Sequence, residues 1–405
     1  MPGPARYFVT AAEAADLLRV TRATLYAYRS RGQLRSEPTP GRPRERRYYL
    51  DDVERLKDRK EARHDPTRAA TRALHWGGPV LESGITLIHN GTCYYRGRDA
   101  LTLAKSTSVE DVAALLWGAD DTERGRLFDQ PVVLTSRQRA ELRRFAGTGL
   151  APLQIALPIA ASRDPASYDL RPAAVRQAGA RIIRLLTAIV SGRDGREPVH
   201  LALQGVWAPK RNAVAGVIRT ALVLCADHEL NVSAFTARCA ASAGASPYDV
   251  VAAAMATLKG YKHGGAAERV LALVAEADSL KSARALLMNR LRRGEGIPGF
   301  GHPLYPAGDP RAALLLRLAD DSGNEPASRQ FRHLARAGSD VLHDRPNLDF
   351  GLAAVTRAYR LPDEAPLVLF ALGRTIGWIA HAIEQYASGQ LIRPRARYTG
   401  PPPDR

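Results

Sequence analysis

The sequence predicts a mostly α-helical protein in which a large helical body follows a small domain of short helices. Three observations predict this fold class. Apolar residues recur at three- and four-residue spacing along most of the 405-residue chain, and Gly or Pro separates one such segment from the next. Near the start, two short helical segments stand on either side of a tight turn. Apolar residues make up 45% and charged residues 24% of the chain, which is typical of a globular protein with a buried core.

The first two helices are predicted from their capping residues. Thr10 and Glu13 have the spacing of a capping box, and the helix that they start should end near Leu18. A second helix is capped by Thr21 and stopped by Gly32, and so tight a connection predicts a helix-turn-helix. The second helix carries side chains suited to phosphates and base edges. Its candidate DNA-binding residues are Arg22, Thr24, Tyr26 and Arg29.

A basic turn with extended flanks follows in PTPGRPRERRYYL, and Asp51-Asp52 then open a third helix. Residues 1–62 thus resemble the winged helix-turn-helix domain of the MerR and excisionase families. Residues 1–63 hold 15 Lys and Arg against 9 Asp and Glu, a net charge of +6. DNA binding is one interpretation, and an appendage for dimer contacts or protein partners is the other. The candidate phosphate contacts on the wing are Arg44, Arg46 and Arg47.

Composition limits the compartment and the class of site. The net charge of +17 is carried mostly by arginine, which fits either polyanion binding or the codon usage of a GC-rich genome. No apolar run reaches the ~20 uncharged residues of a membrane span, and the start lacks a signal peptide core, so we expect a cytoplasmic protein with no membrane contact. Cys93, Cys225 and Cys239 have spacings that fit neither a zinc site nor a disulfide framework, and no metal is expected.

Residues 63–79 are mixed in charge and show no apolar face, so they are predicted to be a linker before a body of residues 80–405. In that body, β-prone runs flank His89-Asn90-Gly91, which predicts a small hairpin. Beyond the hairpin nearly every segment has helical periodicity, and no glycine-rich dinucleotide or P-loop motif occurs. The clearest helical segments are residues 108–118, 137–147, 173–190, 212–228, 249–260 and 365–385.

The stretch from Ile297 to Arg311, IPGFGHPLYPAGDPR, differs from the helical segments around it. Its three glycines and four prolines exclude a long helix and predict a backbone held in fixed turns. Glycine lets a ligand approach the backbone closely, and Asp309-Pro310-Arg311 places a cation at the start of a helix. Its one histidine, His302, is a candidate functional group. The other interpretation is a rigid surface loop with an incidental histidine.

Three further segments place polar residues within the apolar helical pattern. His228 closes an apolar helix at a bend, where a ligand can reach it. His263 stands just before a new helix, whose positive dipole end favours a neutral imidazole that can donate to a carbonyl oxygen. Asp349 lies between Leu348 and Phe350, which should raise the basicity of its carboxylate. A helix cap or a buried hydrogen-bond acceptor is the alternative role for this aspartate.

Together these segments resemble one family, citrate synthase. The resemblance covers about residues 80–400 and follows the family's order through seven motifs. The motifs are GITLIHNGTCYYRG, DHELNVSAFTAR, HGGA, IPGFGHPLYPAGDPRA, NLDFGLA, LFALGRTIGWIAHAIEQ and LIRPRARYTGP. The resemblance implies the citrate synthase fold of a large and a small helical domain, with the small one at approximately residues 265–355.

The resemblance implies a carbon–carbon condensation between acetyl-CoA and oxaloacetate. Asp349 would be the general base that removes a methyl proton of acetyl-CoA, while His263 hydrogen-bonds the thioester oxygen and stabilises the enolate. His302 would polarise the ketone of oxaloacetate and later protonate the new alkoxide. The resemblance implies no cofactor and no metal, because acetyl-CoA is a co-substrate and arginines and histidines supply the electrophilic assistance.

The resemblance also implies binding groups for both substrates. Guanidinium groups suit the two carboxylates of oxaloacetate, and the matching residues are His228, Arg311, Arg374 and Arg393. In the family the arginine matching Arg393 comes from the other subunit, so a homodimer is implied. The candidate residues for coenzyme A are Ile297, Pro298, Gly299, Phe300 and Gly301, with Arg292 and Arg293 for its phosphates unless these two are ordinary solvated arginines.

Three positions depart from the common family pattern. Lys262 should further disfavour protonation of His263, Ala267 lacks the amide of a common asparagine, and Pro303 directly follows the second histidine. The sequence leaves three functions open. The first is a citrate synthase, and the second is a 2-methylcitrate synthase that uses propionyl-CoA, since one methylene is worth only ~1 kcal/mol. The third is a DNA-binding regulator whose synthase-like body senses oxaloacetate or an acyl-CoA.

Overall fold

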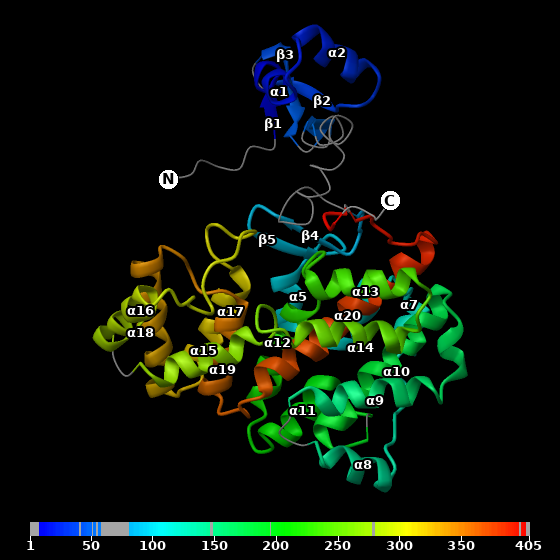
Figure 1. Ribbon diagram of the computed structural model, residues 1–405, viewed down its shortest axis with the longest axis vertical. Coiled ribbons are helices and arrows are strands. Elements are labelled where there is room, and N and C mark those ends of the chain that lie inside the picture. Colours follow the sequence, from blue (N-terminus) through cyan, green and yellow to red (C-terminus); the bar gives the residue numbers. More distant parts are fainter. Residues whose placement is uncertain are drawn as a thin grey trace. The chain divides into compact units, whose positions relative to one another are not determined.

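The computed structural model describes residues 8–39, 42–50, 52–53, 56–57, 81–145, 149–194, 196–277, 280–396 and 398–401. The side chains of residues 42–44, 143 and 280 are not described. The chain forms two compact units, Met1–Glu82 and Ser83–Arg405 (Figure 1). The predicted linker at residues 63–79 and most of the predicted third helix of the first domain lie outside the described residues.

The first unit contains the predicted helix-turn-helix. Its two helices are α1 (Ala11–Leu18) and α2 (Arg22–Ser30). The capping box is present, because Thr10 and Glu13 each accept a hydrogen bond from the other's backbone N–H. Arg19 has a left-handed φ of 52° and turns the chain toward Thr21, which caps α2 as predicted. The second helix ends before Gly32, as predicted.

A three-stranded antiparallel sheet completes the first unit. Its strands are β1 (Phe8–Thr10), β2 (Ser36–Thr39) and β3 (Arg42–Tyr49), in the order β1-β3-β2. The β2–β3 pair is the predicted wing, and its register shifts between Pro38 and Thr39. The sheet and helices share a small apolar core of their own. Its buried members are Val9, Ala14, Ala15, Leu18, Leu25, Leu34, Tyr48, Val53 and Leu56.

The second unit begins with a small antiparallel sheet of order β4-β5-β6. Its strands are β4 (Thr86–His89), β5 (Thr92–Tyr95) and β6 (Arg98–Asp99). The first two strands form the predicted hairpin. Asn90 and Gly91 have φ values of 50° and 72°, and two successive positive φ values are what a type I′ turn requires. Strand β6 was not predicted, because two residues carry no readable alternation.

The rest of the second unit is mainly helical, and each of the six predicted helical segments overlaps an observed helix. These six are α6 (Val109–Trp117), α8 (Ser136–Arg143), α10 (Pro172–Ser191), α12 (Ala213–Cys225), α14 (Pro247–Leu258) and α20 (Ala365–Ser388). The other described elements are α5 (Ala100–Ser106), α7 (Asp121–Arg124), α9 (Ala151–Ala161), the 3-10 helix η1 (Pro165–Tyr168), α11 (Val199–Trp207), α13 (Val232–Ser242), α15 (Ala266–Ala275), α16 (Leu280–Arg292), α17 (Pro310–Asp320), α18 (Glu325–Leu342) and α19 (Leu348–Ala358).

Helix α20 forms the centre of the second unit. It packs against α6, α10, α12, α13 and α14, and Figure 1 shows it among α12, α13 and α14. Its apolar window has the length and hydropathy of a membrane span, but 100% of that window is buried inside the protein. The helix therefore has the composition of a core element, since it meets other helices on all sides.

Helices α15 to α19 pack on one another beside this centre. Helix α17 contacts α19, α16 contacts α18, and α15 and α19 also reach α20. The rings of Phe300, Phe331 and Phe350 meet edge to face in this group, with centroids 5.2 and 5.3 Å apart. The group covers much of the range predicted as a small domain, residues 265–355, and that division stays a prediction. The candidate site lies where this group meets α20.

Candidate active site

The stretch from Ile297 to Arg311 is a series of turns, as predicted, and it leads into α17. A neighbouring segment holds its backbone. The Asn347 N–H donates to the Gly299 carbonyl at 2.9 Å, and the Gly301 N–H donates to the Arg345 carbonyl at 2.9 Å. The loop is therefore fixed against the start of α19, and several of the backbone groups predicted to receive coenzyme A already have partners.

His302 lies in this loop, close to His228 and Tyr305. The ring centroid of His302 is 4.8 Å from that of His228 and 5.2 Å from that of Tyr305. The Leu304 N–H donates to Nδ1 of His302 at 3.2 Å, so the proton of the neutral ring is on Nε2. Burial, together with the charge of Arg311, lowers the pKa of His302 to about 4. His302 is therefore a neutral N–H donor at pH 7, which argues against an incidental surface histidine.

His228 lies at the bend that follows α12, as predicted, and its side chain is buried. The bend is marked by Glu229, whose φ is 50°. Nε2 of His228 lies 3.0 Å from the Tyr305 hydroxyl. Burial lowers the pKa of His228 well below its ordinary value, and the nearby charges of Arg311 and Arg374 act in the same direction. Two neutral histidines thus share one tyrosine at this place.

Arg311 is buried at the start of α17 and is paired with Asp309, the N-cap residue of the same helix. Nε and Nη2 of Arg311 donate to the two oxygens of Asp309 at 3.0 and 2.8 Å. Asp309 also accepts from the Leu348 N–H at 3.1 Å, which connects α17 to α19. The predicted carboxylate-binding arginine therefore already has one carboxylate partner, and that partner orients its guanidinium.

Asp349 lies in the first turn of α19. The side chain of Asn347 caps this helix by accepting from the N–H groups of Asp349 and Phe350, so the alternative role of Asp349 as a cap is wrong. Its Oδ1 is buried and has no hydrogen-bond partner among the described residues. Burial raises the pKa of Asp349 to about 7, as its apolar neighbours predicted. A carboxylate of this basicity can remove a proton near neutral pH.

His263 lies just before α15, as predicted, with its ring against that of Phe370 on α20 at 5.6 Å. Nε2 of His263 lies 2.9 Å from the Ser233 hydroxyl. Burial lowers the pKa of His263 to about 4, and the charge of Arg374 acts in the same direction. The ring is therefore neutral, as predicted from its place near a helix N-terminus.

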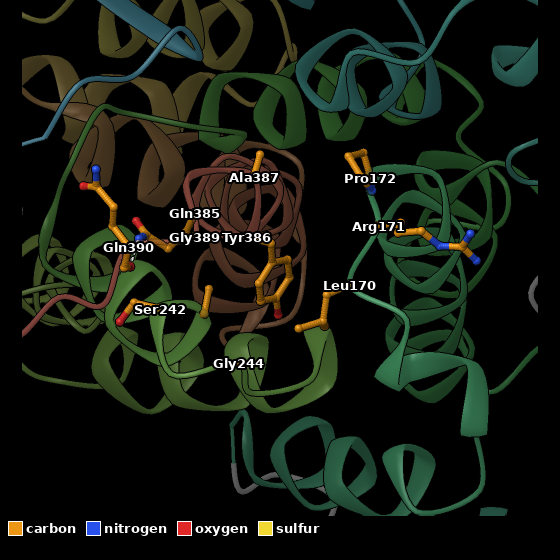
Figure 2. A pocket seen from close by; sticks show the side chains of 11 residues that line it. Leu170, Arg171, Pro172, Ser242, Gly244, Gln385, Tyr386, Ala387, Gly389 and Gln390 are labelled. Atoms are coloured by element: carbon orange, nitrogen blue, oxygen red, sulfur yellow. Dashed lines mark hydrogen bonds between the residues drawn. The ribbon is translucent and has the colours of Figure 1, made fainter.

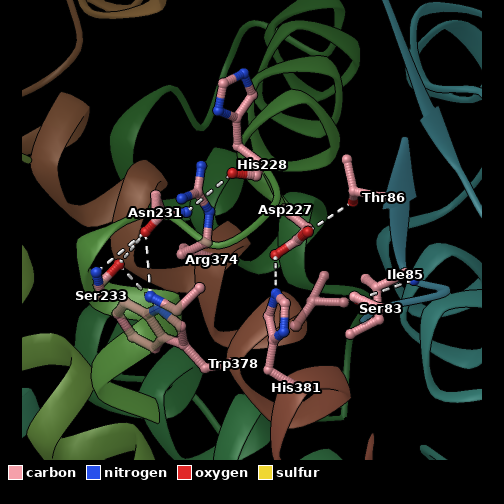
Figure 3. A network of polar contacts seen from close by, with 12 residues as sticks. Ser83, Ile85, Thr86, Asp227, His228, Asn231, Ser233, Arg374, Trp378 and His381 are labelled. Carbon is pink, nitrogen blue, oxygen red and sulfur yellow. Dashed lines mark hydrogen bonds and ion pairs between the residues drawn. The ribbon is translucent and has the colours of Figure 1, made fainter. Parts of the chain in front are cut away.

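The Ser233 hydroxyl connects His263 to two other elements. It lies 2.8 Å from Oδ1 of Asn231, and the indole N–H of Trp378 on α20 donates to it at 3.1 Å (Figure 3). Asn231 caps α13, so its Oδ1 can only accept. The single hydroxyl proton of Ser233 therefore faces two acceptors, Asn231 and His263, and its direction decides which nitrogen of His263 carries the ring proton.

Arg374 is buried on α20 and is oriented by its Nε, which donates to the Cys225 carbonyl at 2.7 Å. Its guanidinium carbon lies 4.7 Å from the ring centroid of Phe370. Its charge affects the pKa values of His228, His263 and Asp349. Arg311 acts in the same way on the pKa values of His228, His302 and Asp349, so these two arginines together reach all three catalytic candidates.

The fourth predicted oxaloacetate residue lies elsewhere in this chain. Arg393 is exposed on the segment after α20, and no contact between it and the other site residues is found in the described part of the chain. The arginines predicted for coenzyme A are also exposed. Arg293 pairs with Glu295 at 2.5 Å, as solvated arginines often do, and Arg292 is exposed at the end of α16.

The three departures from the family pattern have partial structural explanations. Lys262 was expected to lower the pKa of His263, but its ammonium lies over the exposed Tyr261 ring, 5.8 Å from the centroid. The cation that lowers the pKa of His263 is Arg374. Ala267 is buried in α15. Pro303 is exposed, and it stands between His302 and the Leu304 N–H that fixes the ring. Its fixed φ suits this short turn.

The predicted DNA-binding residues of α2 divide into two kinds. Arg22, Tyr26 and Arg29 are exposed and follow one another at spacings of four and three, which places them on one helix face. Thr24 instead bonds to Thr21, the N-cap residue, with 2.9 Å between their hydroxyls. One face of α2 is thus open to a partner.

The wing arginines that the structure describes are engaged within the wing. Nε of Arg46 donates to the Ser36 hydroxyl at 3.0 Å. Arg47 forms an ion pair with Glu37 and lies 4.0 Å from the ring centroid of Phe8. The side chain of Arg44 is outside the description. The described arginines of the wing, Arg46 and Arg47, are therefore less free to contact phosphates than the sequence predicted.

A pocket of about 460 Å³ lies between the start of α10 and the end of α20 (Figure 2). It contains none of the predicted site residues. Its lining is Leu170, Arg171, Pro172, Ala241, Ser242, Gly244, Gln385, Tyr386, Ala387, Gly389 and Gln390. Among the described residues, no group of three or more His, Cys, Asp or Glu could hold a metal ion. The chemistry of the buried cluster, and not the size of a cavity, therefore identifies the candidate site.

Two family models match the chain. The C-terminal domain of citrate synthase matches residues 74–395, and a helix-turn-helix domain matches residues 8–61. Citrate synthase 2 of Bacillus subtilis is 30% identical over 359 residues, which are 82% of this chain and 96% of that protein. The citrate synthase of Haloferax volcanii is 31% identical over 354 residues, which are 79% and 93% of the two chains.

Solved structures share the fold of the second unit. The citrate synthase of Pyrobaculum aerophilum matches with a TM-score of 0.71 and 23% identity, over 81% of this chain and 92% of that one. The enzyme of Thermoplasma acidophilum, solved in a ternary complex with carboxymethyl coenzyme A and oxaloacetate, matches with a TM-score of 0.68 and 23% identity, over 80% and 95%. At this identity the likeness shows the fold alone.

Proposed function

Because the chain belongs to the citrate synthase family, we propose that it condenses acetyl-CoA with oxaloacetate and hydrolyses the citryl thioester to citrate and CoA. One observation carries this proposal. Arg374 acts on the pKa of both Asp349, a carboxylate with a pKa of about 7, and the neutral His263, and Arg311 acts on both Asp349 and the neutral His302. A weakly acidic C–H bond requires such a base together with groups that stabilise the enolate.

The first step is proton removal. Asp349 takes a proton from the methyl carbon of acetyl-CoA, the C–H bond breaks, and the electron pair moves toward the thioester oxygen. His263 donates a hydrogen bond to that oxygen through Nδ1–H. For this role the Ser233 hydroxyl proton points to Nε2 of His263, one of the two directions that its contacts allow.

The second step forms the carbon–carbon bond. The enolate carbon attacks the ketone carbon of oxaloacetate while Nε2–H of His302 polarises the ketone oxygen and then protonates the alkoxide. The proton that Asp349 removed in the first step balances the one that His302 gives, and its return through solvent restores both groups. Arg311 and Arg374 bind the two carboxylates, with His228 as a further donor. Water then cleaves the thioester, the C–S bond breaks, and CoA leaves as the thiol. The buried, preoriented guanidinium groups need little reorganisation when the substrate arrives.

The activity is tested by incubating the purified protein with acetyl-CoA and oxaloacetate and following the release of free thiol. His302→Ala is the control, because it removes the N–H donor to the ketone. Thiol release that is no faster than in this control would overturn the proposal. The same assay with propionyl-CoA tests the alternative, a 2-methylcitrate synthase, through the ratio of the two kcat/KM values.

The proposal includes a homodimer in which Arg393 of one subunit completes the site of the other. Its support is the exposed position of Arg393 and the absence of contacts to its own site in the described part of the chain. Co-expression of Arg393→Ala with Asp349→Asn tests this. Mixed dimers would regain one intact site if Arg393 crosses the interface. They would stay inactive if each arginine served its own subunit.

A second function, DNA binding by the first unit, is favoured by the open face of α2 with Arg22, Tyr26 and Arg29. In this role the body senses oxaloacetate or an acyl-CoA and changes the affinity for DNA. Genomic DNA fragments are captured with the full-length protein, with and without these ligands. Arg29→Ala is compared with Arg137→Ala. The second variant removes the same charge from an exposed position on α8. Equal capture by both variants, or no enriched site, would count against a specific interface.

We place the protein in the cytoplasm. The support is its three free cysteines, of which Cys93 and Cys225 are buried, because unpaired thiols suit a reducing compartment.

A further inference from the structure

The segment from Cys225 to Asp227, which directly precedes His228, is held by three hydrogen bonds from two elements, α20 and strand β5. The Cys225 carbonyl accepts from Nε of Arg374 at 2.7 Å. The Ala226 carbonyl accepts from the N–H of Gly377 on α20 at 2.9 Å. The Asp227 carbonyl accepts from the Tyr95 hydroxyl at 3.2 Å. The segment therefore has almost no freedom to move independently of α20 and strand β5.

The side chain of Asp227 adds a buried charge to this arrangement. Its Oδ2 accepts from the Thr86 hydroxyl at 2.6 Å, and its Oδ1 lies 3.2 Å from Nε2 of His381 (Figure 3). Neither of these two atoms has a hydrogen-bond partner among the described residues, so the contact between them is mainly electrostatic. Burial alone would raise the pKa of Asp227, but His381, Arg374 and Thr86 hold it below its ordinary value. The group is therefore a carboxylate with zero exposed area.

The protonation of His381 follows from its other neighbour. Nε of Arg238 donates to Nδ1 of His381 at 3.1 Å, so Nδ1 bears a lone pair. The ring proton is therefore on Nε2, the nitrogen that faces Asp227. Arg238 is itself paired with Glu384, which accepts from the Gly84 N–H at 2.9 Å. The contacts from Glu384 through Arg238 thus fix the orientation of the His381 ring and the position of its proton.

Helix α20 approaches the segment so closely that a glycine is required. A Cβ at position 377 would lie 2.4 Å from both the Ala226 carbonyl oxygen and Oδ1 of Asp227. Along α20, Arg374 stands one turn before this crossing and His381 one turn after it. The carboxylate of Asp227 therefore contacts α20 between Arg374, the candidate substrate-binding arginine, and His381.

We propose that Asp227 and His381 are positioning residues for the oxaloacetate site. The pair fixes the segment that directly precedes His228 against the helix that carries Arg374, so that both groups face the same dicarboxylate. The inference rests on the proposed function, since it assigns a role within that site. Neither residue contacts the reacting atoms, and the acyl-CoA side of the site, at His263 and Asp349, depends on other contacts. The expected defect therefore concerns one substrate of the two.

The test uses His381→Asn and His381→Gln in the full-length protein. The asparagine oxygen replaces Nδ1 as an acceptor for Arg238 but does not reach Asp227, whereas the glutamine amide can replace Nε2–H as a donor to Asp227. We expect His381→Asn to raise the KM for oxaloacetate about tenfold, with kcat and the KM for acetyl-CoA within a factor of about two. We expect His381→Gln to restore the oxaloacetate KM to within a factor of about three of the wild type.

Asp227→Asn is a second variant. Thr375→Val is the matched control on α20, because the Thr375 hydroxyl bonds only to the backbone of its own helix in the described part of the chain. Oxaloacetate affinity is also measured by calorimetry, which does not need turnover. Equal affinity in wild type, His381→Asn and Asp227→Asn would overturn the inference, as would equal damage from the asparagine and glutamine variants. A wild-type protein that neither binds oxaloacetate nor releases thiol would instead overturn the proposed function.

Discussion

The Ser233 hydroxyl lies 2.9 Å from Nε2 of His263 and 2.8 Å from Oδ1 of Asn231, so one proton is shared between two acceptors. This relationship predicts the effect of Ser233→Ala. Without the hydroxyl, Nε2 of His263 has no donor to hold the Nδ1–H form that the thioester oxygen needs. We expect kcat to fall on the order of 10²-fold with the KM for oxaloacetate unchanged, measured by thiol release.

Thr236→Ala is the control for this prediction. Thr236 lies one turn further along α13, and among the described residues its hydroxyl bonds only to the Val232 carbonyl and the Thr257 hydroxyl. A kcat that falls equally in both variants would show that loss of any hydroxyl from α13 is sufficient, and would contradict a specific role of Ser233.

The raised pKa of Asp349 predicts the pH dependence of the reaction. The base acts when ionised, so kcat/KM for acetyl-CoA should rise about tenfold per pH unit up to about pH 7 and then level off. His263 and His302 have pKa values of about 4, so they remain neutral above pH 5 and add no second step. The profile is measured between pH 5 and 9 in overlapping buffers. A flat profile down to pH 5 would disagree with this assignment.

The same pKa predicts that Asp349 costs stability. Its pKa is raised from 3.8 to about 7, so the folded state binds the proton more tightly than the unfolded state does. The free energy of unfolding therefore falls as pH rises from about 4 to 7 and stays reduced above that range. Asp349→Asn removes this cost. We expect the inactive variant to be more stable than wild type at pH 8, by on the order of 1–4 kcal/mol, and similar to it at pH 4.

Asp309→Asn is the contrasting variant for this denaturation experiment. Burial raises the pKa of Asp309, but its ion pair with Arg311 overcomes that effect and holds the pKa below its ordinary value. Neutralising Asp309 leaves a buried guanidinium without its carboxylate. We expect a loss of about 3–5 kcal/mol at pH 8. If both Asp349→Asn and Asp309→Asn stabilised the protein, the opposite pKa shifts assigned to these two carboxylates would be wrong.

Gly338→Ala should affect the coenzyme A side of the site. A Cβ at this position of α18 would lie 2.2 Å from the ring of Phe300, which belongs to the loop predicted to bind coenzyme A. The ring, and with it the loop backbone, must move. We expect the KM for acetyl-CoA to rise at least fivefold while the oxaloacetate KM stays within about twofold. Gly216→Ala, in an open position of α12, is the control and should be neutral or slightly stabilising.

Much of the fold was predictable because the signals are local. The capping box at Thr10, the Asn90-Gly91 turn and the helices that end in glycine each depend on residues only a few positions apart. Asp349 was predictable for the same reason, since its immediate neighbours Leu348 and Phe350 supply the apolar environment.

The contacts that orient the site could not be predicted in this way. Ser233 and His263 are 30 positions apart in the sequence, and Asp227 and Thr86 are 141 apart. At such separations the spacing of residues does not predict which side chains meet. A partial signal existed for Ser233, because Asn231 has the character of a helix cap and the serine two residues later belongs to that turn. The cation nearest in sequence to His263, Lys262, misled the prediction, because a flexible side chain can turn to the surface.

Helix α20 also has a consequence for how the protein is made. It follows in the sequence every helix against which it packs, from α6 to α19, and it supplies the surface that buries their apolar faces. During synthesis the apolar faces of those helices stay exposed until residue 388 has left the ribosome and α20 can pack against them. The first unit has a separate core and can fold long before. The body should thus be the part that needs chaperone protection, and ribosome-bound chains halted before residue 365 should resist proteases only in the first unit.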